Sequence, residues 1–290
     1  NIYIIIMVKF SIIGDMGSGS KYQYLVAKSL ENIIKKYKSS FVCGLGDNIY
    51  ESGCICPDDK QFETKFEKPY KKIPNKIKFF MCLGNHDYGK YLGLFNIDNS
   101  INQIIYSYLS QEKNKKWILP DKYYTFKKGN IQFYVLDTNI DRMTQTEINK
   151  QLKFIKRKIK ESTSKWNIVY GHHTWRSVGG HGNADTDLET FFNSIFNTGK
   201  IDLYMCGHDH SKQFIYKKLP KNKSMYLLVC GTGGKNTDYV HNTSNLKEND
   251  SELLHFSDTL GTAFIETKQN TLNIKFFNLD NEEKNLNIKK

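Results

Sequence analysis

Five short segments combine glycine with polar residues of the kinds that bind metal ions. Each follows an apolar run, and they read IIGD, GLGDNIY, CLGNHD, VYGHH and MCGHDH. Glycine permits a sharp turn and lets the backbone approach a ligand closely. Carboxylate, amide and imidazole groups suit iron, manganese or zinc. The polar residues of the segments are Asp15, Asp47, Tyr50, Asn85, His86, Asp87, His172, His173, His208, Asp209 and His210.

Each segment alone is weak evidence, because an aspartate after glycine is commonly part of a turn and a histidine pair commonly lies at a surface. Together, five polar clusters at the ends of apolar runs have no shared structural explanation. Ligands of α/β proteins bind beyond the carboxyl ends of the strands. We therefore expect the five clusters to converge on one metal site.

The glycine-rich stretch after Asp15 raises a second reading, a loop that cradles a phosphate. No Lys-Ser or Lys-Thr pair follows at the spacing of a P-loop. We expect Gly17 and Gly19 to bend the chain before a helix capped at Ser18 or Ser20.

The elements that must position these residues alternate along the chain. Apolar runs predict strands at 8–14, 40–44, 78–83, 166–170 and 201–206, and further strands at 213–219, 225–230, 262–267 and 272–279. Helical periodicity marks 20–37 and 145–162, the second opening with a capping box of Thr144 and Glu147. Shorter helices are expected near 62–71, 101–111 and 187–197, and a hairpin is expected to turn at Gly129-Asn130. The alternation indicates an α/β layered fold with two packed sheets.

One domain is expected over residues 8–280, which is long enough to bury a core. Residues 1–7 are expected to be an N-terminal extension, which is not native if Met7 is the true start, and residues 281–290 are expected to be a polar tail. Neither a clear signal peptide nor a membrane span is found. Cytoplasmic and secreted locations both stay open.

The net charge of +12 comes almost entirely from lysines that are scattered along the chain, since the arginines are only Arg142, Arg157 and Arg176. We interpret them as a solvated surface that attracts phosphate-bearing substrates, without a specific nucleic-acid partner. The six cysteines do not form a disulfide framework: four lie in apolar runs, and Cys54 and Cys56 are too close together. A monomer is expected.

The motif series GD…GDN…GNHD…GH…GHDH resembles that of the calcineurin-like metallophosphoesterases, over about residues 8–275. The resemblance implies a four-layer αββα sandwich, two mixed sheets flanked by helices, with a dinuclear metal centre. Many members carry Asp-x-His in the first motif, whereas Met16 and Gly17 follow Asp15 here. Tyr50, three residues after Asp47, resembles the iron-binding tyrosine of the purple acid phosphatases, and the spacing resembles their small, tartrate-resistant type.

The resemblance also implies a ligand set. Fe(III) would bind Asp15, Asp47, Tyr50 and His210, and Fe(II), Zn(II) or Mn(II) would bind Asp47, Asn85, His172 and His208, with Asp47 as the bridge. Asn85, His86 and His181 would face the substrate. Asp87 would orient His86, although a purely structural hydrogen bond is the alternative. His173 is not expected to be a ligand, because adjacent residues point apart.

Three features depart from the family pattern. Met16 replaces a tryptophan of the first motif, and GHHT replaces a motif in which proline follows. The segment LDTNIDRMTQTEINKQL lacks the longer protease-sensitive loop of mammalian members, so no activation by cleavage is expected. The disulfide pattern of the family has no clear match.

The expected activity is hydrolysis of phosphomonoesters, either small molecules or phosphoproteins, by attack of a metal-bound hydroxide on phosphorus. His86 would stabilise the phosphoryl charge or protonate the leaving oxygen, and His181 would assist from the opposite wall. A phosphodiesterase or nuclease on the same scaffold is the first alternative. A non-catalytic binding protein that retains the fold is the second.

Overall fold

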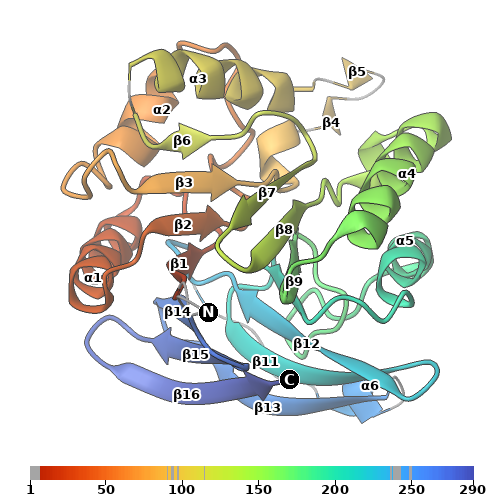
Figure 1. Ribbon diagram of the computed structural model, residues 1–290. Coiled ribbons are helices and arrows are strands. Elements are labelled where there is room, and N and C mark those ends of the chain that lie inside the picture. Colours follow the sequence, from red (N-terminus) through yellow and green to blue (C-terminus); the bar gives the residue numbers. More distant parts are fainter. Residues whose placement is uncertain are drawn as a thin grey trace.

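Two seven-stranded sheets pack face to face, with helices on their outer faces (Figure 1). This computed structural model describes residues 7–89, 91–92, 95–96, 98–113, 115–235, 237, 243–247 and 250–290. The predicted α/β sandwich of two mixed sheets with flanking helices is confirmed.

The first sheet has the strand order β16-β15-β14-β1-β2-β3-β6. Its strands β1, β2, β3 and β6 run parallel, and β14 joins β1 in antiparallel fashion. The strands are β1 (Lys9–Ile13), β2 (Phe41–Gly44), β3 (Lys78–Met81), β6 (Trp117–Ile118), β14 (Thr262–Lys268), β15 (Thr271–Phe277) and β16 (Glu282–Lys289).

The second sheet has the order β13-β11-β12-β10-β9-β8-β7. Its central strands β8, β9, β10 and β12 are parallel, so this sheet is mixed as well. The strands are β7 (Tyr124–Lys128), β8 (Ile131–Val135), β9 (Trp166–Tyr170), β10 (Leu203–Cys206), β11 (Lys212–Leu219), β12 (Lys223–Cys230) and β13 (Ser251–Ser257). A small separate hairpin joins β4 (Tyr91–Leu92) to β5 (Phe95–Asn96).

The helices begin where their caps predict. Ser20 caps α1 (Lys21–Tyr37) by accepting from the Tyr22 amide, and the Thr144–Glu147 capping box opens α4 (Gln145–Glu161). The other helices are α2 (Lys60–Phe62), α3 (Ser100–Glu112), α5 (Thr186–Phe196) and α6 (Ser244–Lys247), with a π-helical turn at Glu63–Glu67 and 3-10 turns at His86–Tyr88 and Ile140–Arg142. None of the helices in the described part of the chain has both the length and the apolar character to cross a bilayer.

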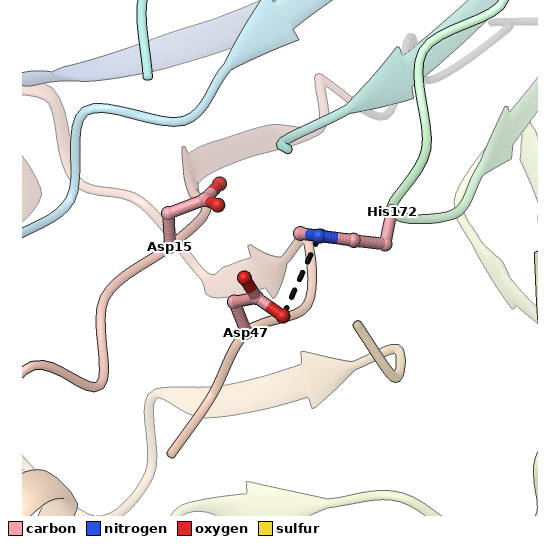
Figure 2. A group of neighbouring side chains, drawn as sticks. All are labelled: Asp15, Asp47 and His172. Atoms are coloured by element: carbon pink, nitrogen blue, oxygen red, sulfur yellow. Dashed lines mark ion pairs between the residues drawn. The ribbon is translucent and has the colours of Figure 1, made fainter. Parts of the chain in front are cut away.

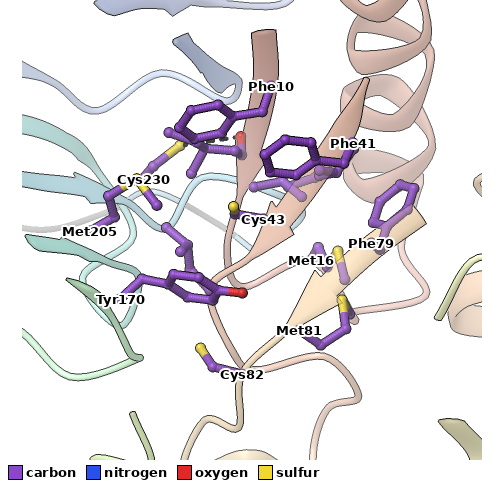
Figure 3. Packing of buried hydrophobic residues seen from close by; sticks show 14 of the residues in the cluster. Phe10, Met16, Phe41, Cys43, Phe79, Met81, Cys82, Tyr170, Met205 and Cys230 are labelled. Atoms are coloured by element: carbon purple, nitrogen blue, oxygen red, sulfur yellow. Dashed lines mark hydrogen bonds between the residues drawn. The ribbon is translucent and has the colours of Figure 1, made fainter. Parts of the chain in front are cut away.

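The space between the sheets is filled by apolar and aromatic side chains (Figure 3). Phe10 and Phe41 of the first sheet lie edge-on to Phe133 of the second, with ring centroids 5.3 and 5.6 Å apart. On the far side of the second sheet, α4 and α5 bury a separate apolar cluster. This packing fixes the two sheets relative to each other and therefore fixes the strand ends that carry the polar motifs.

Phe133→Ala is expected to lower the free energy of unfolding by about 3–5 kcal/mol, because it leaves a cavity at the centre of the inter-sheet contacts. Phe133 is fully buried and also stacks on Phe126 at 4.6 Å. Urea denaturation measures the change. Ile55→Ala is the control, since Ile55 is 78% exposed and its truncation should change stability by less than about 0.5 kcal/mol. Equal effects of the two variants would contradict the assigned core.

Besides the short strands β4, β5 and β6, two longer strands were not predicted from the sequence. Residues 281–290, expected as a polar tail, instead supply β16, which pairs with β15 at the edge of the first sheet. The hydrophobic pattern of β16 is weak because this edge strand buries only part of one face. Its buried residue Ile288 is 4% exposed and pairs with Leu272. Strand β13, which pairs with β11, was likewise not predicted. Of the expected extension, residues 1–6 lie outside the described part of the chain.

Candidate metal centre

The five polar motifs all follow parallel strands, and this arrangement brings them together. Asp15 follows β1, Asp47 follows β2 and Asn85 follows β3 in the first sheet, while His172 follows β9 and His208 follows β10 in the second. Carboxyl ends of parallel strands meet at one edge of a sheet. Figure 2 shows Asp15, Asp47 and His172 pointing toward one another from three different segments. Their ligand atoms all lie within 4.8 Å of one another.

A first group of donor atoms surrounds the phenol of Tyr50. The Tyr50 hydroxyl donates to Oδ1 of Asp15 at 3.0 Å and lies 3.3 Å from Nε2 of His210. The same His210 nitrogen lies 3.5 Å from Asp15 Oδ1. One phenol, one carboxylate and one imidazole therefore face a common point, which is the combination expected for the first metal.

A second group of donor atoms surrounds Nε2 of His172. Oδ1 of Asn85 lies 3.0 Å from this nitrogen, Nδ1 of His208 lies 3.2 Å from it, and Oδ1 of Asp47 lies 3.4 Å from it. A ligand oxygen of Asp47 also lies within 4.8 Å of one of Asp15, the carboxylate of the first group. Asp47 thus lies between the two groups, and a role as bridging ligand stays a prediction.

The loops that carry these groups are tied to one another through the backbone. Oδ2 of Asp15 accepts from the amide of His208 at 3.0 Å, and Oδ1 of Asp47 accepts from the amide of His86 at 3.0 Å. Asp15, Asp47 and His208 have φ of 55°, 51° and 70°, in the left-handed region that non-glycine residues rarely adopt. Such strain persists only where the surroundings impose it.

Glycine is required where these loops cross. A Cβ on Gly207 would stand 2.3 Å from Oδ2 of Asp15, and one on Gly84 would stand 2.2 Å from Oδ1 of Asp47. Both contacts are far inside van der Waals distance. The glycines of the sequence motifs therefore allow the backbone to approach the carboxylates.

The electrostatics of the cluster fit a bound cation. Burial, followed by the charges of Asp15 and Asp47, raises the pKa of the Tyr50 phenol well above its usual value. Burial would also raise the pKa of Asp47, but His172 and His86 lower it below its usual value. Two buried carboxylates and a phenol thus share a small space, and a cation would relieve their repulsion and favour the phenolate. The hard oxygen donors and the imidazoles match iron, zinc or manganese.

His172 is oriented for ligation, whereas His173 is not. Nδ1 of His172 lies 2.9 Å from the carbonyl oxygen of Leu45, which can only accept, so Nδ1 carries the proton and Nε2 presents its lone pair to the cluster. His173 instead bonds to Thr138 Oγ1 at 2.8 Å, and burial followed by the charge of His172 lowers its pKa to about 3. The interpretation of His173 as a structural residue agrees with these contacts.

The two histidines expected to face the substrate lie on either side of the donor groups. The His86 ring lies 4.5 Å from that of Tyr50, and its Nδ1 donates to the carbonyl oxygen of Glu51 at 2.7 Å. The exposed ring of His181 stacks on that of His208 at 3.9 Å.

The contacts of Asp87 favour the structural alternative over orientation of His86. Asp87 is fully buried, and its carboxylate accepts from the amides of Gly84, Asn48 and Ile49 and from the side chains of Asn48 and Gln103. Burial followed by the charge of Asp47 raises its pKa to about 6, against the hydrogen bonds that favour the ionised form. Asp87 joins the second and third motif loops, so its role is structural.

A cleft of about 620 Å³ opens beside the second donor group. Asn85, His86 and His173 line it on the side of the cluster, and Thr138, Arg142 and Asp185 are among the residues on its other walls. A substrate that occupies the cleft would reach Asn85 and His86 directly.

Sequence reasoning assigned no role to several residues that support the site. Asp209 accepts from the amide of His181 at 2.8 Å and from the Ser177 hydroxyl, and so holds the His181 loop. Thr138 accepts from the amides of His172 and His173 at 3.3 and 3.1 Å. Both follow apolar strands, as the assigned residues do, and that signal was available. Gln103 lies on α3 without any comparable signal.

The loop after His172 is anchored by an ion pair between Arg176 and Glu189 of α5. Burial opposes ionisation of Glu189, but hydrogen bonds from Arg176 lower its pKa below the usual value. A depressed carboxylate pKa stabilises the fold above about pH 4.5, and that stabilisation is lost as the pH falls through the folded-state pKa.

Glu189→Gln is therefore expected to destabilise the protein by about 2 kcal/mol at pH 7, since Arg176 is only 5% exposed. The difference from the wild type should shrink below pH 4.5. Urea denaturation at several pH values measures it. Glu161→Gln, at a carboxylate 53% exposed and paired with Arg157, should cost less than about 0.5 kcal/mol. A pH-independent loss would contradict the ion pair as its cause.

All six cysteines are free thiols, as expected from their spacing. Met16, which stands in place of the family tryptophan, is fully buried in the inter-sheet core. This departure from the pattern therefore changes core packing close to Asp15.

Comparison with known protein sequences finds relatives of one kind. In sequence, the chain is 27% identical to purple acid phosphatase 3 of Arabidopsis thaliana, over 94% of the chain and 75% of that protein. It is 25% identical to tartrate-resistant acid phosphatase type 5 of Sus scrofa, over 72% of the chain and 66% of that protein. Both relatives are acid phosphatases by name.

Two solved structures share the fold. GAP50, described as the anchor in the inner membrane complex of Plasmodium, superposes with a TM-score of 0.77 at 22% identity, over 98% of this chain and 90% of that one. The purple acid phosphatase PPD1 of yellow lupin superposes with a TM-score of 0.73 at 15% identity, over 98% and 54%. The model of the calcineurin-like phosphoesterase family matches residues 8–212, which include every motif that forms the cluster, and the chain belongs to that family.

Proposed function

We propose that the chain is an acid phosphatase that hydrolyses phosphomonoesters with two metal ions. Fe(III) would be held by Asp15, Asp47, Tyr50 and His210, and Fe(II), Zn(II) or Mn(II) by Asp47, Asn85, His172 and His208. The observation that carries the proposal is the position of Asp47, which lies within 4.8 Å of Asp15 in the phenol-containing group and 3.4 Å from His172 in the histidine-containing group. The named relatives are acid phosphatases, which supports this reaction class.

When bound, the two cations would supply Lewis-acid activation of a phosphoryl group and of water. Asn85 and His86 line the cleft and would contact the phosphoryl oxygens. Because Nδ1 of His86 donates to the Glu51 carbonyl, its Nε2, which lies 3.9 Å from Oδ2 of Asp47, is the nitrogen that can hold or release a proton to a bound substrate. The imidazolium form would donate that proton to the leaving oxygen. His181, whose amide Asp209 holds, would approach the substrate from the His208 side.

A non-catalytic scaffold is the main alternative, because GAP50 is described as an anchor. The hydrolase is favoured by the completeness of the donor groups, in which each expected ligand contacts another. A phosphodiesterase is favoured only by the net charge of +12, which attracts monoesters equally well.

Hydrolysis of p-nitrophenyl phosphate against that of bis(p-nitrophenyl) phosphate tests the proposal. The iron-loaded protein should favour the monoester by about a hundredfold in kcat/KM, because a dianionic phosphoryl group pairs better with two cations. His86→Ala should lower kcat for the monoester more than it raises KM. A preference for the diester would establish the phosphodiesterase. Lack of turnover in a protein that has bound its metals would establish the scaffold.

A further inference from the structure

A lysine-lined groove runs along one face of α1, away from the candidate metal centre. Two cavities, of about 480 and 570 Å³, are lined on one side by this helix and on the other by the segment that leads into β3. The helix residues of the first cavity are Tyr24, Ala27, Lys28 and Glu31, and those of the second are Ile34, Lys35 and Lys38. Residues spaced by three or four lie on one helix face, so the two cavities follow a single stripe.

The opposite wall is continuous as well. Lys68, Pro69, Lys71, Lys72 and Ile73 line the first cavity, and Pro74, Lys76 and Ile77 line the second. From Tyr24 to Lys38 the helix extends for about 21 Å, which matches about six residues of extended peptide. We call this feature the α1 groove.

The α1 groove is far more basic than the chain as a whole. Its walls carry seven lysines, at positions 28, 35, 38, 68, 71, 72 and 76. Among the described residues that line it, Glu31 has the one carboxylate, and it pairs with Lys35. The whole chain has 42 basic and 30 acidic residues. If these charges were evenly distributed, the groove would contain more acidic residues than the one that is found among its described lining residues. The local charge therefore calls for an anionic occupant.

The shape of the α1 groove and the residues that line it limit the kinds of anion that can bind there. The lysines are exposed, whereas Ala27, Ile73 and Ile77 are 3%, 1% and 7% exposed and provide an apolar floor. An extended peptide directs alternate side chains to opposite sides, so carboxylates can reach the lysines while small apolar side chains cover the floor. Single-stranded nucleic acid would require stacking aromatic residues or arginine, and Tyr24 is the one aromatic among the described lining residues. A lipid surface would not enter a concave groove.

We propose that the α1 groove docks an extended acidic segment of a partner protein, in which Asp or Glu alternates with small apolar residues. The groove includes Ser39, Ser40 and Ile77, which precede β2 and β3, whereas the metal centre follows the carboxyl ends of these strands. Docking at this end leaves the cleft beside Asn85 and His86 open. The proposal stands whether or not the chain is a phosphatase.

Binding of a fluorescein-labelled peptide of alternating Glu and Ala, followed by anisotropy at low and high salt, tests the proposal. The variant Lys28→Glu/Lys72→Glu, with one change on each wall, should weaken binding by about tenfold or more. The matched variant Lys156→Glu/Lys160→Glu changes the net charge equally on the exposed face of α4 and should weaken binding by less than about twofold. Hydrolysis of p-nitrophenyl phosphate should be unchanged in both.

Equal losses of affinity in the two double variants would overturn the proposal, because they would assign peptide binding to net charge. Failure of the wild type to bind the peptide would also overturn it. Tighter binding of oligouridylate RNA or of phosphatidylserine vesicles, lost in Lys28→Glu/Lys72→Glu, would assign the groove to a different class of partner and also overturn the proposal. Thermal melting shows whether Lys28→Glu/Lys72→Glu folds. If it does not, Lys28→Gln/Lys72→Gln removes the charges without reversing them. This variant should still weaken binding more than Lys156→Gln/Lys160→Gln.

Discussion

Asp47→Asn is expected to reduce phosphatase activity by about a thousandfold or more, because it removes the charge that lies between the two donor groups. The carboxylate contacts His172 at 3.4 Å and accepts from the His86 amide at 3.0 Å. An amide has the same shape and can still accept the second bond, so the fold should survive. The measurements are kcat/KM for p-nitrophenyl phosphate and metal content by mass spectrometry.

Asp187→Asn is the matched control, because Asp187 is exposed in the first turn of α5 and is not among the described residues that line the cleft. It should retain activity within about twofold and bind the same amount of metal. Full activity in Asp47→Asn, with an unchanged metal content, would remove the basis for a shared ligand.

Tyr50→Phe is expected to bleach the iron-loaded protein. A phenolate bound to Fe(III) gives a violet charge-transfer colour, and Phe fills the same pocket without an oxygen. Tyr50 is 1% exposed, and this change removes only its hydroxyl, which contacts Asp15 and His210, so the protein should fold. The visible absorption spectrum of the oxidised protein is the measurement, and it does not depend on turnover.

Tyr88→Phe supplies a close control for the colour. Tyr88 is also buried and also donates to a carboxylate, that of Asp137, but it lies outside both donor groups. Its spectrum should match that of the wild type. If the wild type loaded with iron is colourless, or if Tyr50→Phe keeps the violet band, the tyrosine is not a ligand of the ferric ion.

Much of the site was predictable because its residues follow apolar runs directly. The strand before Asp15 and the strand before His172 are buried along almost their whole length and are mostly apolar, and such strands belong to parallel segments covered on both faces. Parallel strands place their ends together, so the convergence of Asp15 and Asp47 needed no knowledge of strand order, whereas the approach of His172 also depends on how the second sheet packs against the first. The capping residues Ser20 and Thr144 predicted their helices for an equally local reason.

The remaining features depend on contacts between distant segments. The role of Asp87 is set by Asn48 and Gln103, which are 39 and 16 residues away, and nothing in GNHD distinguishes a carboxylate that orients His86 from one that joins two loops. Strand β16 could not be recognised, since its residues become partly buried only once β15 lies beside them. The local sequence reveals neither the hydrogen-bond partners of Asp87 nor the strand that pairs with β16.

The amide hydrogen bonds to Asp15 and Asp47 have a consequence for how the protein is loaded. Each of these bonds joins a carboxylate oxygen to a backbone amide of another loop, so hydrogen bonds within the protein help to gather the loops. We therefore expect a largely preformed pocket, in which capture of iron or zinc requires little rearrangement of the chain. Protein stripped by a chelator should then keep its shape and refill readily.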